Sequence, residues 1–466
     1  ERNGGLTYWM IDTLTSVATQ GRPLTYKQLH DRIQAQIQSR FPQQLPMIMG
    51  ESDRRVFGSE TWAIPYTVLV QAVDIDKGQV TLGAGQAQGL SKGARFAIYP
   101  LNTTDFTELE KRVAIVEIAK KPDADKSRAK LLAPEAGGID MVGTLELGAP
   151  AVMVSAPVNL IQRVRLFDGK GLGATDDNEL PAQLVGRQTE AIAQVREALQ
   201  GNGWVVEAQE DETATYQVAI DRQGNYEICQ AMPIPNLRPL LSIDDPSAPE
   251  QVVQRLVHLT KYQAVQTLDN ASSKLSKNLT AQLLTEEGDP FPDPQNPVVE
   301  DGDIVTLRLK NHGNHPLKVA VLDLEPTWEI SQIPLGGFDS PFLPLPPGAE
   351  EEMQLQMGLP DDDAYQKSVE TLKVFAIQNG LADFRWLTLP ALDEPPTAWG
   401  NQLNDELSRS ATRSVSGDSS INPLNDLLSM IGADMETPPT NTRSATLVRN
   451  PKDEWVTQQI QIVVNS

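Results

Sequence analysis

The chain has 466 residues, 40% of them hydrophobic, and carries 62 acidic against 39 basic side chains, for a formal net charge of −23. This length is enough for about three or four domains, and the acidic surplus argues against nucleic acid and anionic membranes as partners. No apolar run approaches the roughly 20 residues of a membrane helix, and no signal peptide is visible. The single cysteine excludes an internal disulfide and fits a reducing compartment, so we expect a cytoplasmic protein.

Residues 1–57 are predicted to form two helices and a short buried strand. The first helix has an apolar face made of Leu6, Met10, Ile11, Leu14 and Val17. The second begins with a capping box of Thr25 and Gln28, and Pro42 ends it. Its apolar face consists of Leu29, Ile33, Ile37 and Phe41. The apolar run 45–49 suits a strand covered on both faces, which needs a sheet to join.

Three phrases in this stretch occur in the order found in one protein family. Glu1 precedes a Gly-Gly-x-Thr-Tyr helix start at 4–8, followed by Leu-Thr-Tyr-x-x-Leu at 24–29 and Gln-x-Pro-x-x-x-Gly at 44–50. On these phrases, residues 1–57 resemble the C-terminal, small-subunit part of caspase-like cysteine peptidases of the bacterial metacaspase and orthocaspase group. The resemblance implies an endopeptidase that cleaves protein or peptide substrates after arginine or lysine. An ordinary helical pair with one strand is the alternative.

The resemblance also implies that the catalytic residues lie outside this chain. Family members use a His and a Cys on the large subunit, upstream of this stretch, because a thiolate needs a nearby imidazole. Cys229 lies at a strand position and is interpreted as a small buried residue. No motif places beside it any of the four histidines, His30, His258, His312 and His315. We therefore predict no catalytic, cofactor-binding or metal-binding residue here, and we expect the N-terminal caspase-like large subunit of the same, longer protein as partner.

After a linker at 58–65, residues 66–156 have the pattern of a small β-barrel or sandwich. Six strands are predicted, at 66–73, 79–82, 94–99, 112–119, 128–132 and 142–147. The glycine-rich phrase at 84–93 precedes neither a helix nor Gly-Lys-Ser/Thr, so it indicates tight corners and not a phosphate loop.

Residues 157–285 are predicted to form a small α/β domain with mixed strand pairing. Its strands are expected at 160–167, 204–207, 215–220 and 225–230, and its helices at 183–200 and from Pro249 to near Asn270. The loop Gly169–Gly173 has the wrong spacing for a dinucleotide-binding turn, and a nucleotide site there is only a minor alternative.

Residues 296–392 plus 453–465 are predicted to form an antiparallel β-sandwich, with 384–389 as one strand and 453–464 as the last. This part resembles a β-rich accessory domain of bacterial caspase-like proteins, through Gly302-Asp303, Pro347-Gly348 and the phrase at 370–375. The proline-rich 289–297 lacks the glycine and closing Glu of a calcium loop.

Residues 400–447 are polar and are predicted to be a mostly disordered insertion. Three arginines there, Arg409, Arg413 and Arg443, would suit cleavage after arginine, whereas the alternative is an ordinary disordered loop.

The sequence thus predicts a multidomain α/β and all-β protein: the end of a caspase-like α/β domain, then a small β-barrel, a small α/β domain and an antiparallel β-sandwich. The predicted function is the C-terminal portion of a caspase-like cysteine endopeptidase, whose later modules regulate access, bind a partner or position substrate. The alternative is a non-catalytic scaffold or sensor with a degenerate caspase-like domain.

Overall fold

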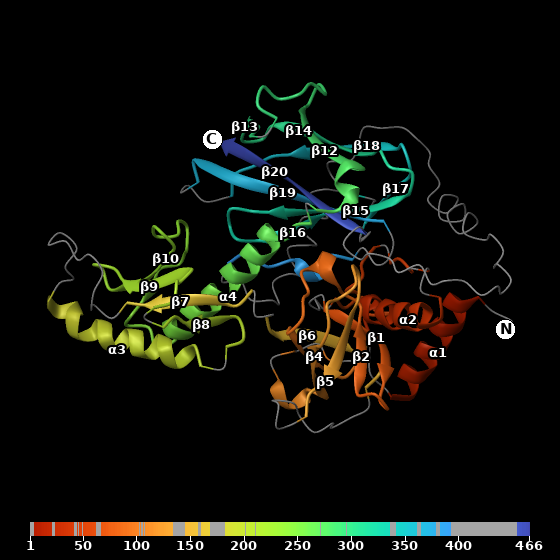
Figure 1. Ribbon diagram of the computed structural model, residues 1–466, viewed down its shortest axis with the longest axis horizontal. Coiled ribbons are helices and arrows are strands. Elements are labelled where there is room, and N and C mark those ends of the chain that lie inside the picture. Colours follow the sequence, from red (N-terminus) through yellow and green to blue (C-terminus); the bar gives the residue numbers. More distant parts are fainter. Residues whose placement is uncertain are drawn as a thin grey trace.

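The computed structural model describes most of residues 4–392 and 454–466, and most of its elements are β-strands (Figure 1). Within these ranges the description omits residues 21–23, 42–43, 45, 49, 62–66, 102, 104–105, 107, 134–144, 157–159, 168–181, 201, 210, 271, 295, 336–341, 361–364 and 379–382. The loop at 169–173 and the insertion at 400–447, with its three arginines, lie outside the described residues.

Helices α1 (Gly5–Gln20) and α2 (Tyr26–Arg40) form a pair at one side of the barrel (Figure 1). The predicted capping box of α2 is confirmed, because the Thr25 hydroxyl accepts from the Gln28 N–H at 3.2 Å and the Gln28 side chain accepts from the Thr25 N–H at 3.1 Å. The apolar face of α2 packs against α1 through Leu29, Ile33, Ile37, Trp9 and Leu14.

Two expectations for this stretch are wrong. Phe41, predicted to extend the buried face of α2, is 47% exposed, because the helix ends at Arg40 and Phe41 has left helical geometry. The strand predicted at 45–49 is not formed by the described residues 46–48, which belong to none of the sheets. Those sheets are built from later parts of the chain, so this segment has no strand to pair with.

Six antiparallel strands close into a small barrel, which decides between the two architectures that the sequence left open. In chain order the strands are β1 (Val68–Asp74), β2 (Gln79–Leu82), β3 (Arg95–Ile98), β4 (Ala114–Ile118), β5 (Ser127–Leu131) and β6 (Pro150–Ser155). The barrel order is β1-β2-β5-β4-β3-β6, and pairing of β1 with β6 closes it. Its interior is filled by side chains that include Val70, Leu82, Phe96, Val116 and Ile118.

The sixth barrel strand was misplaced by the sequence pattern. Residues 145–147 of the strand predicted at 142–147 are not in a strand, and the rest of it lies outside the described residues. Gly148 turns the chain with a φ of +81°, and the strand starts at Pro150, because proline fits best at the first position of a strand. The glycine corners are confirmed: Gly89 and Gly93 have φ of +76° and +95°, a region that other residues avoid.

The following part is a five-stranded sheet with two helices packed on it. Its elements are β7 (Gln162–Leu166), α3 (Ala182–Ala198), β8 (Val205–Glu207), β9 (Tyr216–Ile220), β10 (Asn225–Cys229), β11 (Leu241–Ser242) and α4 (Ala248–Thr267). The sheet order is β11-β10-β9-β7-β8. Strand β7 is parallel to β8 and β9, whereas β10 is antiparallel to β9 and β11, so the pairing is mixed as predicted. Ile192 of α3 and Leu256 of α4 are fully buried in its core.

The C-terminal part is a sandwich of two sheets that share one apolar core. The first sheet contains β12 (Leu279–Thr285), β14 (Ile304–Asn311) and β18 (Glu350–Gln356). The second contains β13 (Val298–Glu300), β15 (Leu317–Leu324), β16 (Ile330–Ile333), β17 (Leu343–Leu345), β19 (Lys367–Ile377) and β20 (Trp455–Asn465). Strand β20 is the returning strand predicted at 453–464, and it pairs with β19 along its whole length.

Three details of the predicted sandwich need correction. Strand β12, placed before the sandwich by the boundary at 285, pairs with β14 inside it. Strand β13 is parallel to β20, so the sandwich is not purely antiparallel. The strand predicted at 384–389 is instead a short 3₁₀ helix, η6 (Arg385–Leu387), because Phe384 and Leu387 are buried three residues apart and not in alternation.

Helix α4 lies where the barrel, the mixed sheet and the sandwich meet (Figure 1). Its residues Tyr262 and Val265 belong to one apolar cluster with Ala87 from the barrel side and with Leu322 and Phe375 from the sandwich. The same helix contributes Leu256 to the core of the mixed sheet. The parts of the chain are therefore packed around α4.

Candidate functional site

Cys229 has none of the features of a peptidase nucleophile. Its Sγ lies 3.8 Å from Glu227 Oε2 on β10. Burial and the Glu227 carboxylate raise the pKa of the thiol to about 11, so it is protonated at neutral pH. A catalytic cysteine needs the opposite environment, with a cationic or imidazole neighbour that favours the thiolate.

The histidines have partners other than Cys229 in the described part of the chain. His258 Nε2 is 2.8 Å from the carbonyl oxygen of Trp328, and His312 Nε2 is 3.0 Å from Thr280 Oγ1. His315 follows β14, and its carbonyl accepts from Asn311 at 2.9 Å. The described residues therefore contain no Cys–His pair that could carry out acyl transfer.

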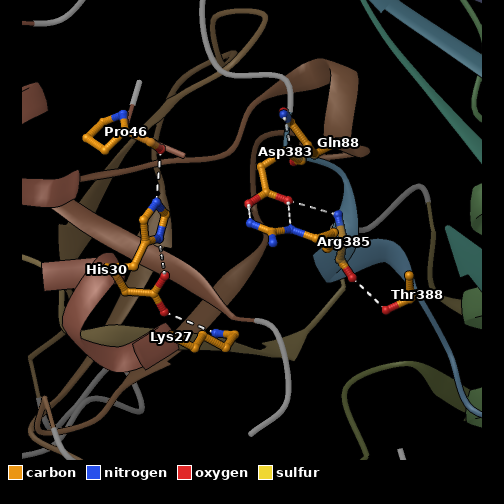
Figure 2. Close-up of polar contacts among 8 residues, drawn as sticks. Lys27, His30, Pro46, Gln88, Asp383, Arg385 and Thr388 are labelled. Atoms are coloured by element: carbon orange, nitrogen blue, oxygen red, sulfur yellow. Dashed lines mark hydrogen bonds and ion pairs between the residues drawn. The ribbon is translucent and has the colours of Figure 1, made fainter. Parts of the chain in front are cut away.

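His30 belongs to a polar cluster on α2 (Figure 2). Its Nε2 donates to the carbonyl oxygen of Pro46 at 2.9 Å, and its Nδ1 lies 3.5 Å from Asp31 Oδ1. Lys27 Nζ, one turn earlier, bonds the other carboxylate oxygen of Asp31 at 3.0 Å. Burial alone would raise the pKa of Asp31, but Lys27 and His30 together hold that pKa well below its usual range. The cluster thus fixes segment 46–48 against α2.

A second ion pair from the far end of the chain faces this cluster (Figure 2). Arg385 bonds Asp383 through Nε at 2.9 Å and Nη2 at 2.6 Å. Burial raises the pKa of Asp383, but Arg385 outweighs it and holds the pKa below its ordinary value, while Asp31 opposes that effect. A small cavity of about 40 Å³ separates the two pairs. Nothing in the sequence links Asp31 to Asp383, because they are far apart along the chain.

The side of α2 that faces the barrel and the sandwich is polar. Lys27, Gln34 and Gln38 recur at helical spacing on this side, and each is at most 9% exposed. Gln38 Oε1 accepts from Gln71 Nε2 of β1 at 3.1 Å. A buried polar face is tolerated only where its groups find partners, and the Gln38–Gln71 bond attaches α2 to β1.

Helix α1, in contrast, exposes several large apolar side chains. The sequence pattern predicted one buried stripe on this helix, yet Leu6 is 55%, Met10 38% and Ile11 50% exposed. Tyr8 adds a further exposed ring, and Trp9 and Leu14 are the described apolar side chains of α1 that pack against α2. We name Leu6, Tyr8, Met10 and Ile11 the α1 surface. These exposed apolar side chains are groups against which another polypeptide surface could pack.

Other classes of site were also considered. Among the described residues, no group of three or more His, Cys, Asp or Glu side chains is arranged to hold a metal ion. No helix in the same part of the chain combines the length and apolarity that a membrane span requires.

No family model matches this chain, and no curated protein is significantly similar to it. The fold is that of a mostly β protein with a closed six-stranded barrel and further sheets. A pair of helices, α1 and α2, packs at the barrel, and α1 exposes several large apolar side chains.

Proposed function

We propose that this chain is the C-terminal portion of a caspase-like cysteine endopeptidase, in which α1, α2 and segment 46–48 complete the peptidase domain. The α1 surface is the observation that supports this proposal most directly. It offers an apolar face to a further polypeptide segment, while the polar side of α2 attaches the pair to the later modules.

Segment 46–48 supports the same proposal. Its Met47 and Ile48 are apolar, and the segment lies beside α2 with no strand next to it in the described structure. The His30 bond to Pro46 fixes one end. The order of helix, helix and this segment is the order that the family resemblance implies for the end of the peptidase domain.

In this proposal the chemistry takes place on the large subunit. Its His forms and holds the thiolate of its Cys, the thiolate attacks the peptide carbonyl, and water hydrolyses the acyl-enzyme. The expected substrates are proteins or peptides with arginine or lysine before the cleaved bond. The barrel, the mixed sheet and the sandwich would regulate access or position substrate, and the only cysteine of this chain, Cys229, takes no part.

A second candidate is a non-catalytic scaffold or sensor with a degenerate caspase-like domain. The observation in its favour is that the cysteine and histidines of this chain have partners of purely structural kinds. In that case the α1 surface would still bind the N-terminal part of the same protein, but no acyl transfer would follow.

The decisive experiment uses the full-length polypeptide that contains this chain. We would incubate it with fluorogenic peptides ending in arginine, lysine or aspartate, with and without a thiol alkylator. The proposal expects cleavage after arginine or lysine that alkylation abolishes. Absence of cleavage of every peptide by the folded protein would favour the scaffold.

The role of the α1 surface is tested in the same assay. Ile11→Asp places a charge on the proposed interface and should lower activity strongly, because an unpaired carboxylate is costly to bury. The matched control is Ser39→Asp, at an exposed position of α2 and away from the α1 surface. Equal activity of both variants would contradict the assigned interface, even if the protein is a peptidase.

A further inference from the structure

A large cavity lies between the barrel, α4 and the sandwich. Its volume is about 740 Å³, within the range of roughly 300–1,000 Å³ that is typical of small-molecule sites. Phe96 and Met153 line it from the barrel, Leu268 from the end of α4, and Trp386 and Leu389 from the segment that contains η6. Three separate parts of the fold therefore form its walls, at a junction where binding sites often occur.

The walls of the cavity are mainly apolar and aromatic. Trp204, Trp386 and Trp455 all line it, beside aliphatic side chains such as Leu387 and Val265. The indole N–H groups of Trp386 and Trp455 are buried and have no acceptor in the described part of the chain. The aromatic and aliphatic side chains make this wall a surface suited to a hydrocarbon or aromatic body.

One cation on the wall has no counter-ion. Lys261 of α4 lies with its Nζ 5.1 Å from the ring centroid of Trp204, in a cation–π contact. Among the described residues no carboxylate pairs with this ammonium. Burial lowers the pKa of Lys261, which is the effect expected of a desolvated ammonium without an anionic partner.

Among the described residues that line the cavity, the one carboxylate, that of Asp269, is already engaged. Asp269 Oδ1 accepts from Thr457 Oγ1 at 2.7 Å and from the backbone N–H of Asn270 at 2.7 Å. The Asp269 charge also acts on the buried ammonium of Lys373, whose pKa it raises against the effect of burial. A further ammonium, that of Lys121, lines the cavity from an exposed position. The charge that remains for a ligand is therefore positive.

We infer that this cavity binds a small molecule with an apolar body and a carboxylate, with the carboxylate at Lys261 and the apolar body between the tryptophans. A carboxylate would supply the counter-ion that Lys261 lacks among the described residues. A neutral apolar molecule would leave the ammonium unpaired, and a cation would meet like charge. The inference does not depend on whether the protein is a peptidase.

The test uses the whole 466-residue chain and three ten-carbon probes below their aggregation limits: decanoate, 1-decanol and decyltrimethylammonium. Binding is measured by calorimetry and by tryptophan fluorescence, because three tryptophans line the cavity. We expect one decanoate per chain, with 1-decanol about tenfold weaker or more, since a bond to a charged group is lost. Decyltrimethylammonium should not bind.

Two variants and a control locate the site. Lys261→Met keeps the length of the side chain and its packing on Trp204, so it should reduce decanoate affinity to that of 1-decanol. Ala264→Phe fills the cavity from the same helix and should weaken both probes. Lys92→Met, at an exposed lysine that does not line the cavity, should change neither.

Two results would overturn the inference. One is the absence of saturable decanoate binding to the folded chain. The other is unchanged decanoate affinity in Lys261→Met, with folding of the variant verified by its circular dichroism spectrum.

Discussion

The stability of the sandwich should fall as the pH rises through neutrality, because of one buried acid. Glu370 on β19 is only 7% exposed. Burial raises the pKa of Glu370 from 4.5 to about 7, and the negative charge of the Glu325 carboxylate is the second cause. Tyr262 of α4 and Asp323 of β15 belong to the same cluster, since Asp323, Glu325 and Glu370 all raise the pKa of the Tyr262 hydroxyl. Among these described residues, no cation offsets the negative charge that Glu370 carries when it is ionised.

Because its pKa is raised, folded Glu370 keeps its proton to a higher pH than the unfolded chain does. Between pH 4.5 and about 7 the unfolded chain has released the proton that folded Glu370 still holds. Its contribution to stability is therefore fully retained below pH 4.5 and lost as the pH rises through 7. One pH unit corresponds to about 1.4 kcal/mol, so the loss by pH 8 is about 3 kcal/mol. Glu370→Gln removes the charge and keeps the shape, and it should regain most of this free energy at pH 8 and almost none at pH 4.5.

Urea unfolding at pH 5 and pH 8 measures the effect. Because the chain contains several packed parts, hydrogen exchange of the peptide 367–377 is needed to identify the transition in which β19 unfolds. Glu351→Gln, at an exposed position of β18, is the control for removing a glutamate charge. Wild type and Glu370→Gln with the same dependence of stability on pH would refute the reasoning.

Three further predictions concern single side chains. Thr25→Ala removes the hydroxyl of the capping box and should cost about 1 kcal/mol in urea unfolding, whereas Thr25→Ser should cost less. Gly203→Ala would place a Cβ against the carbonyl oxygen of Val154, so its melting temperature should fall, whereas that of Gly186→Ala, with open space on α3, should not. Cys229→Ala should leave peptide cleavage by the full-length protein unchanged, and loss of cleavage would contradict the structural role of this thiol.

Local patterns in the sequence were sufficient for many of the elements. The spacing of Thr25 and Gln28 determines a capping box whatever surrounds it, because both hydrogen bonds lie within one turn. Short strand-forming runs, separated by glycine turns in the barrel, located five of the six barrel strands and also β20. The segment 384–389 was wrongly predicted to be a strand. Phe384 and Leu387 are both apolar, and their burial three residues apart is visible only in the structure.

Pairing between distant strands could not be predicted in the same way. Strand β12 directly follows the α/β part in sequence, and nothing in its residues states that its partner is β14. The parallel pair of β13 and β20 joins two segments on either side of the undescribed residues 393–453. Such contacts depend on how closed sheets and shared cores fit together, which is a property of the whole fold and not of a local period.

The orientation of α2 is the most informative difference between expectation and structure. Amphipathicity alone assigns a polar helix face to solvent, yet Lys27, Gln34 and Gln38 lie against the barrel. Burial of these groups costs free energy unless they find partners: Lys27 pairs with Asp31 within α2, and Gln38 bonds Gln71 of the barrel strand β1. A contact that depends on matched polar partners holds the helix pair in one position. With the polar side of α2 engaged, the apolar α1 surface is directed outward, as a docked peptidase subunit would require.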